Sequence, residues 1–468
     1  MISRRLACAL LLSAVGVFGQ NALAQLPGSN KSKPRVQTAA KLPIHAGPYL
    51  ELGPLLGHVS STNAKIWVKA SAPALLSVVV GEKEDLSDRK GFKAPPLVAA
   101  NFFSAHVLVT DLEPNTRYYY AVLTDGQLAT PRPFPSFKTA PAEGASGRQR
   151  FAFASCVGHN GFDSAATWAD MATRTNFDVL LMLGDNHYGD TTAPAKHFEV
   201  FGVQRRLPGY AEICRRVPQY AIWDNHDYGP EPTDKRAKGK EDSLRAFKML
   251  WPNPAYGEQD NPGVYFKFAR GDIDFFMLDG RYYRDPNNAP EDGHKTHLGE
   301  KQLAWLKHEL AASKAKIKVL GVGGEWQTHG QPASWTSFPR ERDDLFKFIE
   351  DKGITGVLLL SGDRHFTAAY QAAGKFIEVT SGPLGSKAVT PRTTPEMFWN
   401  AGGMGRFYCI FDVNTEGAQP EITLEIYRAS EGLVLRRAFT WDEVLGKTKI
   451  KPLPQRAPGV PPGSGAAQ

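Results

Sequence analysis

Six short apolar runs in this chain each end abruptly in polar side chains that can bind a metal ion. Continuous apolar runs are typical of strands buried on both faces. The runs are Phe151–Cys156, Val179–Asp185, Tyr220–Asp227, Phe275–Arg281, Val319–Glu325 and Val357–His365. Ligands in layered α/β folds collect at the carboxyl ends of such strands. The pattern therefore predicts an α/β fold in which Cys, Asp, Tyr, Asn, His and Arg side chains converge on one metal site suited to phosphate chemistry.

Residues 1–24 have the parts of a secretory signal peptide. Arg4 and Arg5 precede an apolar stretch, and Ala22-Leu23-Ala24 forms a cleavage site. The stretch is shorter than the roughly 18 residues of a membrane span, so we expect no stable membrane anchor. Ala7 stands where a twin-arginine signal has a hydrophobic residue, which favours the general secretory route. We therefore expect an exported protein, either periplasmic or secreted.

The net charge and the number of cysteines limit the kinds of partner and of cysteine chemistry that we expect. Loss of the two signal arginines lowers the net charge from +7 to +5, an excess that can attract anionic substrates but also suits any basic exported protein. No long Lys/Arg run is present, so we expect no nucleic-acid-binding tract. Cys156, Cys214 and Cys409 remain, and this odd number implies at least one thiol that is free or metal-bound. Pairing of Cys214 with Cys409 stays open.

At 468 residues the chain is long enough for about two or three domains. Residues 25–46 predict a polar linker. Residues 47–140 show alternating, β-rich patterns. Within them, Leu112–Tyr120 (Leu-x-Pro-x-Thr-x-Tyr-x-Tyr) resembles the tyrosine corner of fibronectin type III-like and Ig-like sandwiches, and Trp67 fits their core tryptophan.

Strand patterns alternate with helical ones over residues 148–445, for example at 301–312, which predicts one large α/β domain. Residues 446–468 are rich in proline and glycine and predict a disordered tail. Residues 228–262 contain a charged stretch that could form a lid over the site or a solvated insertion.

Three motifs at strand ends contain the candidate ligands. In Gly184–Tyr188, Asp185 can bridge two cations and Tyr188 can bind a hard ion such as Fe(III) as a phenolate, although Gly-Asp pairs are also common in surface turns. In Trp223–Asp227, an Asn oxygen can bind a metal and the adjacent His can donate a proton to a leaving group, although an Asx-rich turn has the same composition.

The third motif is Ser361–His365. Asp363 and His365 can both reach a metal from a tight turn at Gly362, which leaves Arg364 free to contact phosphate oxygens. A lone histidine is more often structural, but the preceding apolar run favours the metal interpretation.

These motifs, in this order, resemble those of calcineurin-like metallophosphoesterases, and in detail those of the alkaline phosphatase D (PhoD-like) branch. The details are Ala154-Ser155-Cys156, Trp223–Asp227, Leu278–Arg281, Ser361–His365 and Glu378–Leu384, and the resemblance spans roughly residues 47–440. It implies a four-layer sandwich, in which helices flank two mixed β-sheets, preceded by an all-β sandwich.

The resemblance also implies a metal-dependent phosphoric monoester or diester hydrolase, with metal-bound hydroxide attacking phosphorus in line. Iron(III) would lie among Cys156, Asp185 and Tyr188, and calcium is the expected companion ion. His226 would contact the scissile phosphate or its leaving group, and two arginines would hold the phosphate. The implied metal ligands are Cys156, Asp185, Tyr188, Asn225, Asp363 and His365, and the implied catalytic residues are His226, Arg281 and Arg364.

The chain departs from the family pattern at three places. His187 stands inside the Gly-Asp-x-x-Tyr motif and could either add a ligand or face solvent. Glu325 occupies the region where related enzymes have a metal-binding histidine and could replace it. For Asp279 we expect a salt bridge that orients Arg281.

Two other functions remain open. The protein could be a secreted adhesion or carbohydrate-binding protein with an inactive phosphatase-like domain. It could also be a phospholipase D-type lipid hydrolase that uses the same site. The expected substrate is a phosphate ester, either a small molecule or a cell-wall or lipid phosphodiester, and the oligomeric state is open.

Overall fold

The computed structural model describes residues 47–159, 163–174, 176–329 and 331–453. The expected signal peptide and the expected linker therefore lie outside the described residues.

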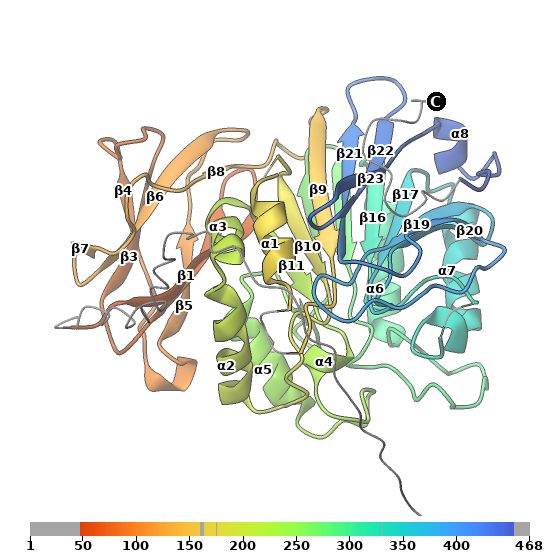
Figure 1. Ribbon diagram of the computed structural model, residues 1–468, viewed down its shortest axis with the longest axis horizontal. Coiled ribbons are helices and arrows are strands. Elements are labelled where there is room, and N and C mark those ends of the chain that lie inside the picture. Colours follow the sequence, from red (N-terminus) through yellow and green to blue (C-terminus); the bar gives the residue numbers. More distant parts are fainter. Residues whose placement is uncertain (1–46, 160–162, 175, 330, 454–468) are drawn as a thin grey trace, which may run out of the picture. The chain divides into compact units, whose positions relative to one another are not determined.

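Residues 50–138 form two antiparallel sheets (Figure 1). One has the order β1-β2-β5, and the other β4-β3-β6-β7 with β8 paired to β6. Alternating apolar side chains of both sheets meet in one buried cluster. The Tyr118 hydroxyl accepts a 2.9 Å hydrogen bond from the Glu113 amide, as the hydroxyl of a tyrosine corner bonds to upstream backbone. The strands are β1 (Leu50–Val59), β2 (Ala64–Ala70), β3 (Leu76–Gly81), β4 (Lys90–Lys93), β5 (Ser104–Val109), β6 (Arg117–Thr124), β7 (Gln127–Leu128) and β8 (Ser136–Lys138).

Trp67 does not lie in the core of this sandwich, so that expectation was wrong. Its neighbours Ile66 and Val68 point into the sandwich core, and alternation along β2 turns Trp67 to the opposite face. There its indole N–H donates a 2.8 Å hydrogen bond to the Met249 carbonyl, within the core of the α/β region.

Two mixed sheets form the α/β region. The six-stranded sheet has the order β11-β10-β9-β21-β22-β23, and the seven-stranded sheet has the order β14-β15-β16-β17-β19-β18-β20. All six apolar runs form strands (β9, β10, β11, β15, β16 and β17), parallel to their neighbours within each set of three. The strands are β9 (Arg148–Ala154), β10 (Val179–Leu183), β11 (Gln219–Ile222), β12 (Gly257–Glu258), β13 (Asn261–Pro262), β14 (Phe266–Arg270), β15 (Ile273–Met277), β16 (Ile317–Gly321), β17 (Val357–Ser361), β18 (Ala368–Ala372), β19 (Phe376–Thr380), β20 (Met397–Asn400), β21 (Phe407–Asn414), β22 (Glu421–Arg428) and β23 (Gly432–Phe439).

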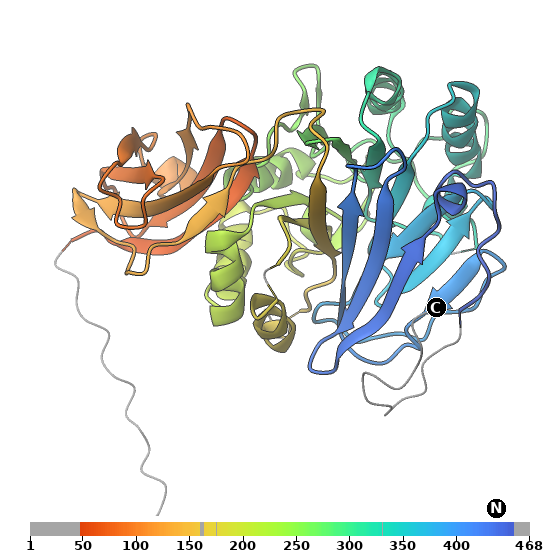
Figure 2. The same ribbon diagram turned by 90° about the horizontal axis from the view of Figure 1, so that it is seen from above.

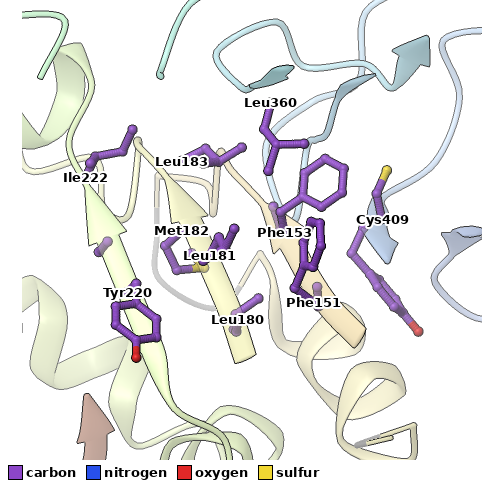
Figure 3. Close-up of a cluster of buried hydrophobic side chains, with 14 of the residues drawn as sticks. Phe151, Phe153, Leu180, Leu181, Met182, Leu183, Tyr220, Ile222, Leu360 and Cys409 are labelled. Atoms are coloured by element: carbon purple, nitrogen blue, oxygen red, sulfur yellow. The ribbon is translucent and has the colours of Figure 1, made fainter. Parts of the chain in front are cut away.

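The two sheets pack face to face through aromatic and aliphatic side chains. Phe151 of β9 meets Phe275 of β15 edge to face, with 5.2 Å between the ring centroids. Phe153 and Leu360, one from each sheet, belong to the same buried cluster (Figure 3). This contact brings the carboxyl ends of both sets of parallel strands into one region.

Helices cover the outer faces of both sheets (Figure 2). Leu306 of α6 and Leu345 of α7 belong to one buried cluster with Leu320 of the seven-stranded sheet, and Tyr408 of β21 donates a hydrogen bond to Asp170 of α1. The four-layer, mixed α/β arrangement is therefore present. The helices are α1 (Ala165–Ala172), α2 (Pro194–Arg205), α3 (Pro208–Arg216), α4 (Asn225–Tyr228), α5 (Lys240–Leu250), α6 (Glu300–Ala312), α7 (Pro339–Asp351) and α8 (Trp441–Val444).

A buried arginine joins the β-rich region to the α/β region. The Arg205 guanidinium carbon lies 4.2 Å from the ring centroid of Trp67, 5.0 Å from that of Phe201 and 5.2 Å from that of Trp251. One nitrogen donates to the Leu250 carbonyl, and no carboxylate pairs with this arginine within the described residues. Burial lowers the pKa of Arg205, because the charged guanidinium is removed from water. Attraction between the guanidinium and the three aromatic faces offsets part of this cost.

Residues 446–453 are the part of the expected tail that the structure describes, and they make specific contacts. Ile450 is 3% exposed and its amide donates to Gln371, and the Leu453 amide donates to the Phe398 carbonyl. One buried side chain and two backbone amides therefore attach this stretch to strands β18 and β20, while most of its other side chains are exposed. Among the described residues, none of the helices combines the length and apolar character that a membrane span requires.

Candidate metal centre

The predicted ligands come from strand ends of both sheets. Potential ligand atoms of Cys156, Asp185 and His365 lie within 4.8 Å of one another, and so do those of Asp185, Asp224 and Asp363. Asp185 is common to both groups, which is the position a bridging carboxylate needs. Asp224 was not among the expected ligands, although its place at the end of an apolar run was a signal for it.

The backbone at these ligands is unusual. Cys156, Asp185, Asp363 and His365 have φ values of 61°, 50°, 67° and 52°, in the left-handed region that few non-glycine residues adopt. Residues held in this region cluster at functional sites, where the surrounding structure stabilises them. Gly362 allows the last turn to approach closely, because a Cβ there would lie 2.7 Å from Cβ of Ser155.

The Tyr188 hydroxyl lies at the centre of a hydrogen-bond cluster. It lies 2.9 Å from His365 Nε2 and donates to Asp185 Oδ2 over 3.2 Å, while the Ser386 hydroxyl donates to it over 2.7 Å. Its ring stacks on His226 with 4.0 Å between the centroids. Tyr188 is therefore placed where its oxygen can join the same centre as Asp185 and His365.

His226 lies at the rim of this cluster and is partly accessible. Its Nδ1 lies 2.7 Å from Asp190 Oδ1, and its backbone amide donates to Asp185 over 3.3 Å. A carboxylate at Nδ1 fixes the ring and directs Nε2 elsewhere. The sequence interpretation missed Asp190, for which a second Gly-Asp pair after Tyr188 was the only signal.

Arg281 is held by Asp224 and not by Asp279, so the expected salt bridge was assigned to the wrong residue. Arg281 Nε lies 2.5 Å from Asp224 Oδ1, and both side chains are almost fully buried. Asp279 instead accepts hydrogen bonds from the Trp223 indole and from the Arg281 amide. It therefore stabilises the turn that presents Arg281.

Arg364 is also anchored by a carboxylate. Its Nε lies 2.9 Å from Glu325 Oε2, and its Nη1 lies 3.8 Å from Asp363. Glu325 also accepts a 2.7 Å hydrogen bond from the Tyr370 hydroxyl. Glu325 is thus a partner of Arg364 and belongs to neither group of potential ligands.

Asn225 begins α4 directly after Asp224. Its side chain is partly accessible. Asp227 fastens this turn, because its two oxygens accept from the amides of Asn186 and Asp224.

His187 is neither a ligand of this centre nor exposed to solvent. It is buried, and its Nε2 lies 2.8 Å from Nδ1 of His197.

The charged stretch after Tyr228 contacts the site, because the Thr233 carbonyl lies 3.4 Å from Arg281 Nη1. Cys156, Cys214 and Cys409 are all free and buried, so the possible disulfide does not form.

The centre holds more negative than positive charge. Burial raises the pKa of Asp185 well above its usual range, and Asp224 and Asp363 raise it further. Burial and Asp224 also raise the pKa of Asp363, to about 6. Burial and Asp185 raise the pKa of the Cys156 thiol. Cations would offset this repulsion, and Asp224 Oδ2 is buried with no hydrogen-bond partner among the described residues. The donor set therefore fits bound metal ions.

Comparison with known proteins identifies relatives among the phosphatases. A family model described as PhoD-like phosphatase matches residues 201–406, and a domain of unknown function (DUF7800) matches residues 47–142. The chain is 28% identical to alkaline phosphatase D of Bacillus subtilis over 376 residues, covering 69% of this chain and 63% of that protein. It is 27% identical to purple acid phosphatase 21 of Arabidopsis thaliana over 205 residues, covering 44% of this chain and 39% of that protein. The chain thus spans less than two thirds of the length of these curated relatives.

Two solved structures share the fold. A structure of PhoD has a TM-score of 0.69 at 20% identity and covers 84% of this chain and 92% of its own. The purple acid phosphatase PPD1 from yellow lupin (Lupinus luteus) seeds has a TM-score of 0.63 at 14% identity and covers 88% of this chain and 78% of its own.

Proposed function

We propose that this chain, which is similar to the PhoD-like phosphatases, hydrolyses phosphoric esters at the centre around Asp185. The observation that carries the proposal is the convergence of two groups of buried metal-binding side chains on this one carboxylate. An inactive adhesion protein would have no need to keep an anionic cluster buried at this cost. The cluster therefore supports a hydrolase over that alternative.

The proposed metals are Fe(III) and Ca²⁺. Cys156, Asp185 and Tyr188 would hold iron, because a thiolate, a carboxylate and a phenolate are anionic donors that suit a trivalent ion. Asn225, Asp363 and His365 would complete the cluster, and Asp224 lies where it can join them. When bound, the ions would lower the pKa of water and neutralise charge that develops on the phosphoryl oxygens.

The protein's own side chains would bind and orient the substrate. Arg281 is fixed through Nε by Asp224 and through Nη1 by Thr233, so its guanidinium is held in one orientation in which it could contact a phosphate oxygen. Arg364, anchored by Glu325, would add a second contact. His226 Nε2 faces away from Asp190, and its partial exposure allows it to donate a proton to the leaving-group oxygen.

We extend the proposal to organisation and location. The β-rich region at 47–140, of fibronectin type III-like or Ig-like type, would be a support domain, and 148–445 the catalytic domain. The protein would be exported to the periplasm or secreted. A lipid phosphodiester could react at the same groups, so lipid substrates belong in the tests.

Metal analysis and activity of purified full-length protein test the proposal. We expect stoichiometric iron with calcium, and hydrolysis of p-nitrophenyl phosphate or bis-p-nitrophenyl phosphate. Asp185→Asn should lose both bound metal and activity because it removes the bridge. Asp412→Asn is the matched control, since Asp412 is buried but pairs with Arg148 and Arg150 at the far end of β9. Full turnover in Asp185→Asn, or no metal after reconstitution, would refute the proposal.

A further inference from the structure

The Tyr188 oxygen has three hydrogen-bonding neighbours with different chemistry. Asp185 can only accept when it is ionised, and His365 would use its facing Nε2 to bind a metal. Ser386 is different because its hydroxyl donates to the Tyr188 oxygen, at 2.7 Å. After loss of the phenol proton, Ser386 is therefore the neighbour that still donates a hydrogen bond.

Backbone contacts fix Ser386 in this position. The amides of Gly385 and Ser386 both donate to the Cys156 carbonyl, over 3.0 and 3.2 Å. A Cβ on Gly385 would lie 2.0 Å from the Val157 carbonyl oxygen, so the loop can approach Cys156 this closely only with glycine. Ser386 is 4% exposed, which removes water as a competing partner for its hydroxyl. The serine is thus anchored to the backbone of one candidate ligand and bonded to the side chain of another.

The hydrogen bond from Ser386 should depend on the charge of the Tyr188 oxygen. The Tyr188 oxygen lies within hydrogen-bond distance of both the Asp185 carboxylate and the Ser386 hydroxyl, and the side chain is buried. Charge-assisted hydrogen bonds are about twice as strong as neutral ones, so the bond strengthens when the oxygen becomes a phenolate.

We propose that Ser386 is a positioning residue that sets the electron density on the Tyr188 oxygen when Tyr188 binds iron. This rests on the proposed function, and in particular on iron at Tyr188. A donor on the phenolate oxygen lowers the energy of its lone pairs. Phenolate-to-iron charge transfer then requires more energy, so the visible band lies at a shorter wavelength.

The test compares visible spectra of the full chain loaded with ferric iron. Ser386→Ala should move the band to longer wavelength by about 10–30 nm, the shift expected if the excited state loses most of a hydrogen bond to a charged oxygen. Ser164→Ala is the matched control, because Ser164 is also buried and its hydroxyl has no partner within the described residues. The control should leave the band unchanged.

Tyr188→Phe separates failure of this inference from failure of the proposed function. If Tyr188→Phe loses the band but Ser386→Ala leaves it in place, the role of Ser386 is overturned and the iron site stands. If the wild type has no band, or Tyr188→Phe keeps it, both assignments fall.

A measurement on the wild type covers the case in which Ser386→Ala does not fold. The resonance Raman C–O stretch of the phenolate should differ between H₂O and D₂O, because the donated proton exchanges. An identical frequency in both solvents would overturn the inference.

Discussion

Removing either partner of the buried ion pair between Asp224 and Arg281 should strongly destabilise the metal-free protein. The effects of removing the two partners should not be additive. The atoms lie 2.5 Å apart, with side-chain exposures of 2% and 5%. Removing one partner of a buried pair costs about 3–5 kcal/mol, because the other charge stays buried without compensation. Asp224→Asn and Arg281→Met remove each charge while keeping most of the side-chain volume.

The neighbouring charges predict which of the two substitutions lowers the free energy of unfolding more. Arg281→Met leaves Asp224 with Asp185 and Asp363, three potential ligands within 4.8 Å of one another. Asp224→Asn instead relieves part of that repulsion. We therefore expect the arginine variant near the upper end of the range and the aspartate variant near the lower end. The double variant should cost less than the sum of the singles by about 2 kcal/mol.

Urea unfolding of chelator-treated protein at neutral pH measures these free energies, with tryptophan fluorescence as the probe. The control cycle is Lys347→Met with Asp351→Asn, an exposed pair for which we expect a coupling below about 1 kcal/mol. Additivity of Asp224→Asn and Arg281→Met within about 0.5 kcal/mol would refute the reasoning. So would an arginine variant more stable than the aspartate variant.

Three further predictions follow from close contacts and buried charge. Gly385→Ala should lower the unfolding free energy by roughly 1–3 kcal/mol in thermal melts, because its Cβ would lie 2.0 Å from a backbone oxygen, whereas Gly91→Ala meets nothing within 4 Å and should not. Metal-free protein should lose stability as the pH rises from about 4 to about 6, since folded Asp363, with its pKa raised to about 6, keeps a proton that the unfolded chain has lost; a flat or rising melting temperature would contradict this. Glu325→Gln should raise KM for a phosphate ester roughly tenfold by freeing Arg364, and an unchanged KM in steady-state kinetics would remove Glu325 from substrate binding.

Strand positions were predictable because buried parallel strands are marked by their own composition. Each of the six apolar runs became a strand, and the motifs at their ends meet, as at Asp185 and Asp363. The division of these strands between two sheets was not predictable, because an apolar run looks the same in either sheet. Strands β21–β23, which complete the six-stranded sheet, lie more than 200 residues further along the chain than β9.

Several partners within the site were not predictable, because the side chains that bond to each other are far apart in sequence. Asp279, two residues from Arg281, was the natural candidate for an ion pair, but the guanidinium reaches Asp224 instead, 57 residues away. Ser386 bonds to Tyr188 across 198 residues. Such contacts depend on how loops cross above the sheets, and no local pattern encodes that crossing.

The aromatic cage around Arg205 bears on how this protein can be divided. One wall of the cage, Trp67, comes from the β-rich region, while Phe201 and Trp251 come from the other side. A fragment that began after residue 140 would lack Trp67. It would expose the apolar surface that Trp67 covers and leave the Arg205 guanidinium with only two of its three aromatic neighbours. The expected boundary near residue 140 is therefore not a place at which the protein can be truncated or joined to part of a relative. In a hybrid protein, the β-rich region and the α/β region should therefore be taken together from the same relative.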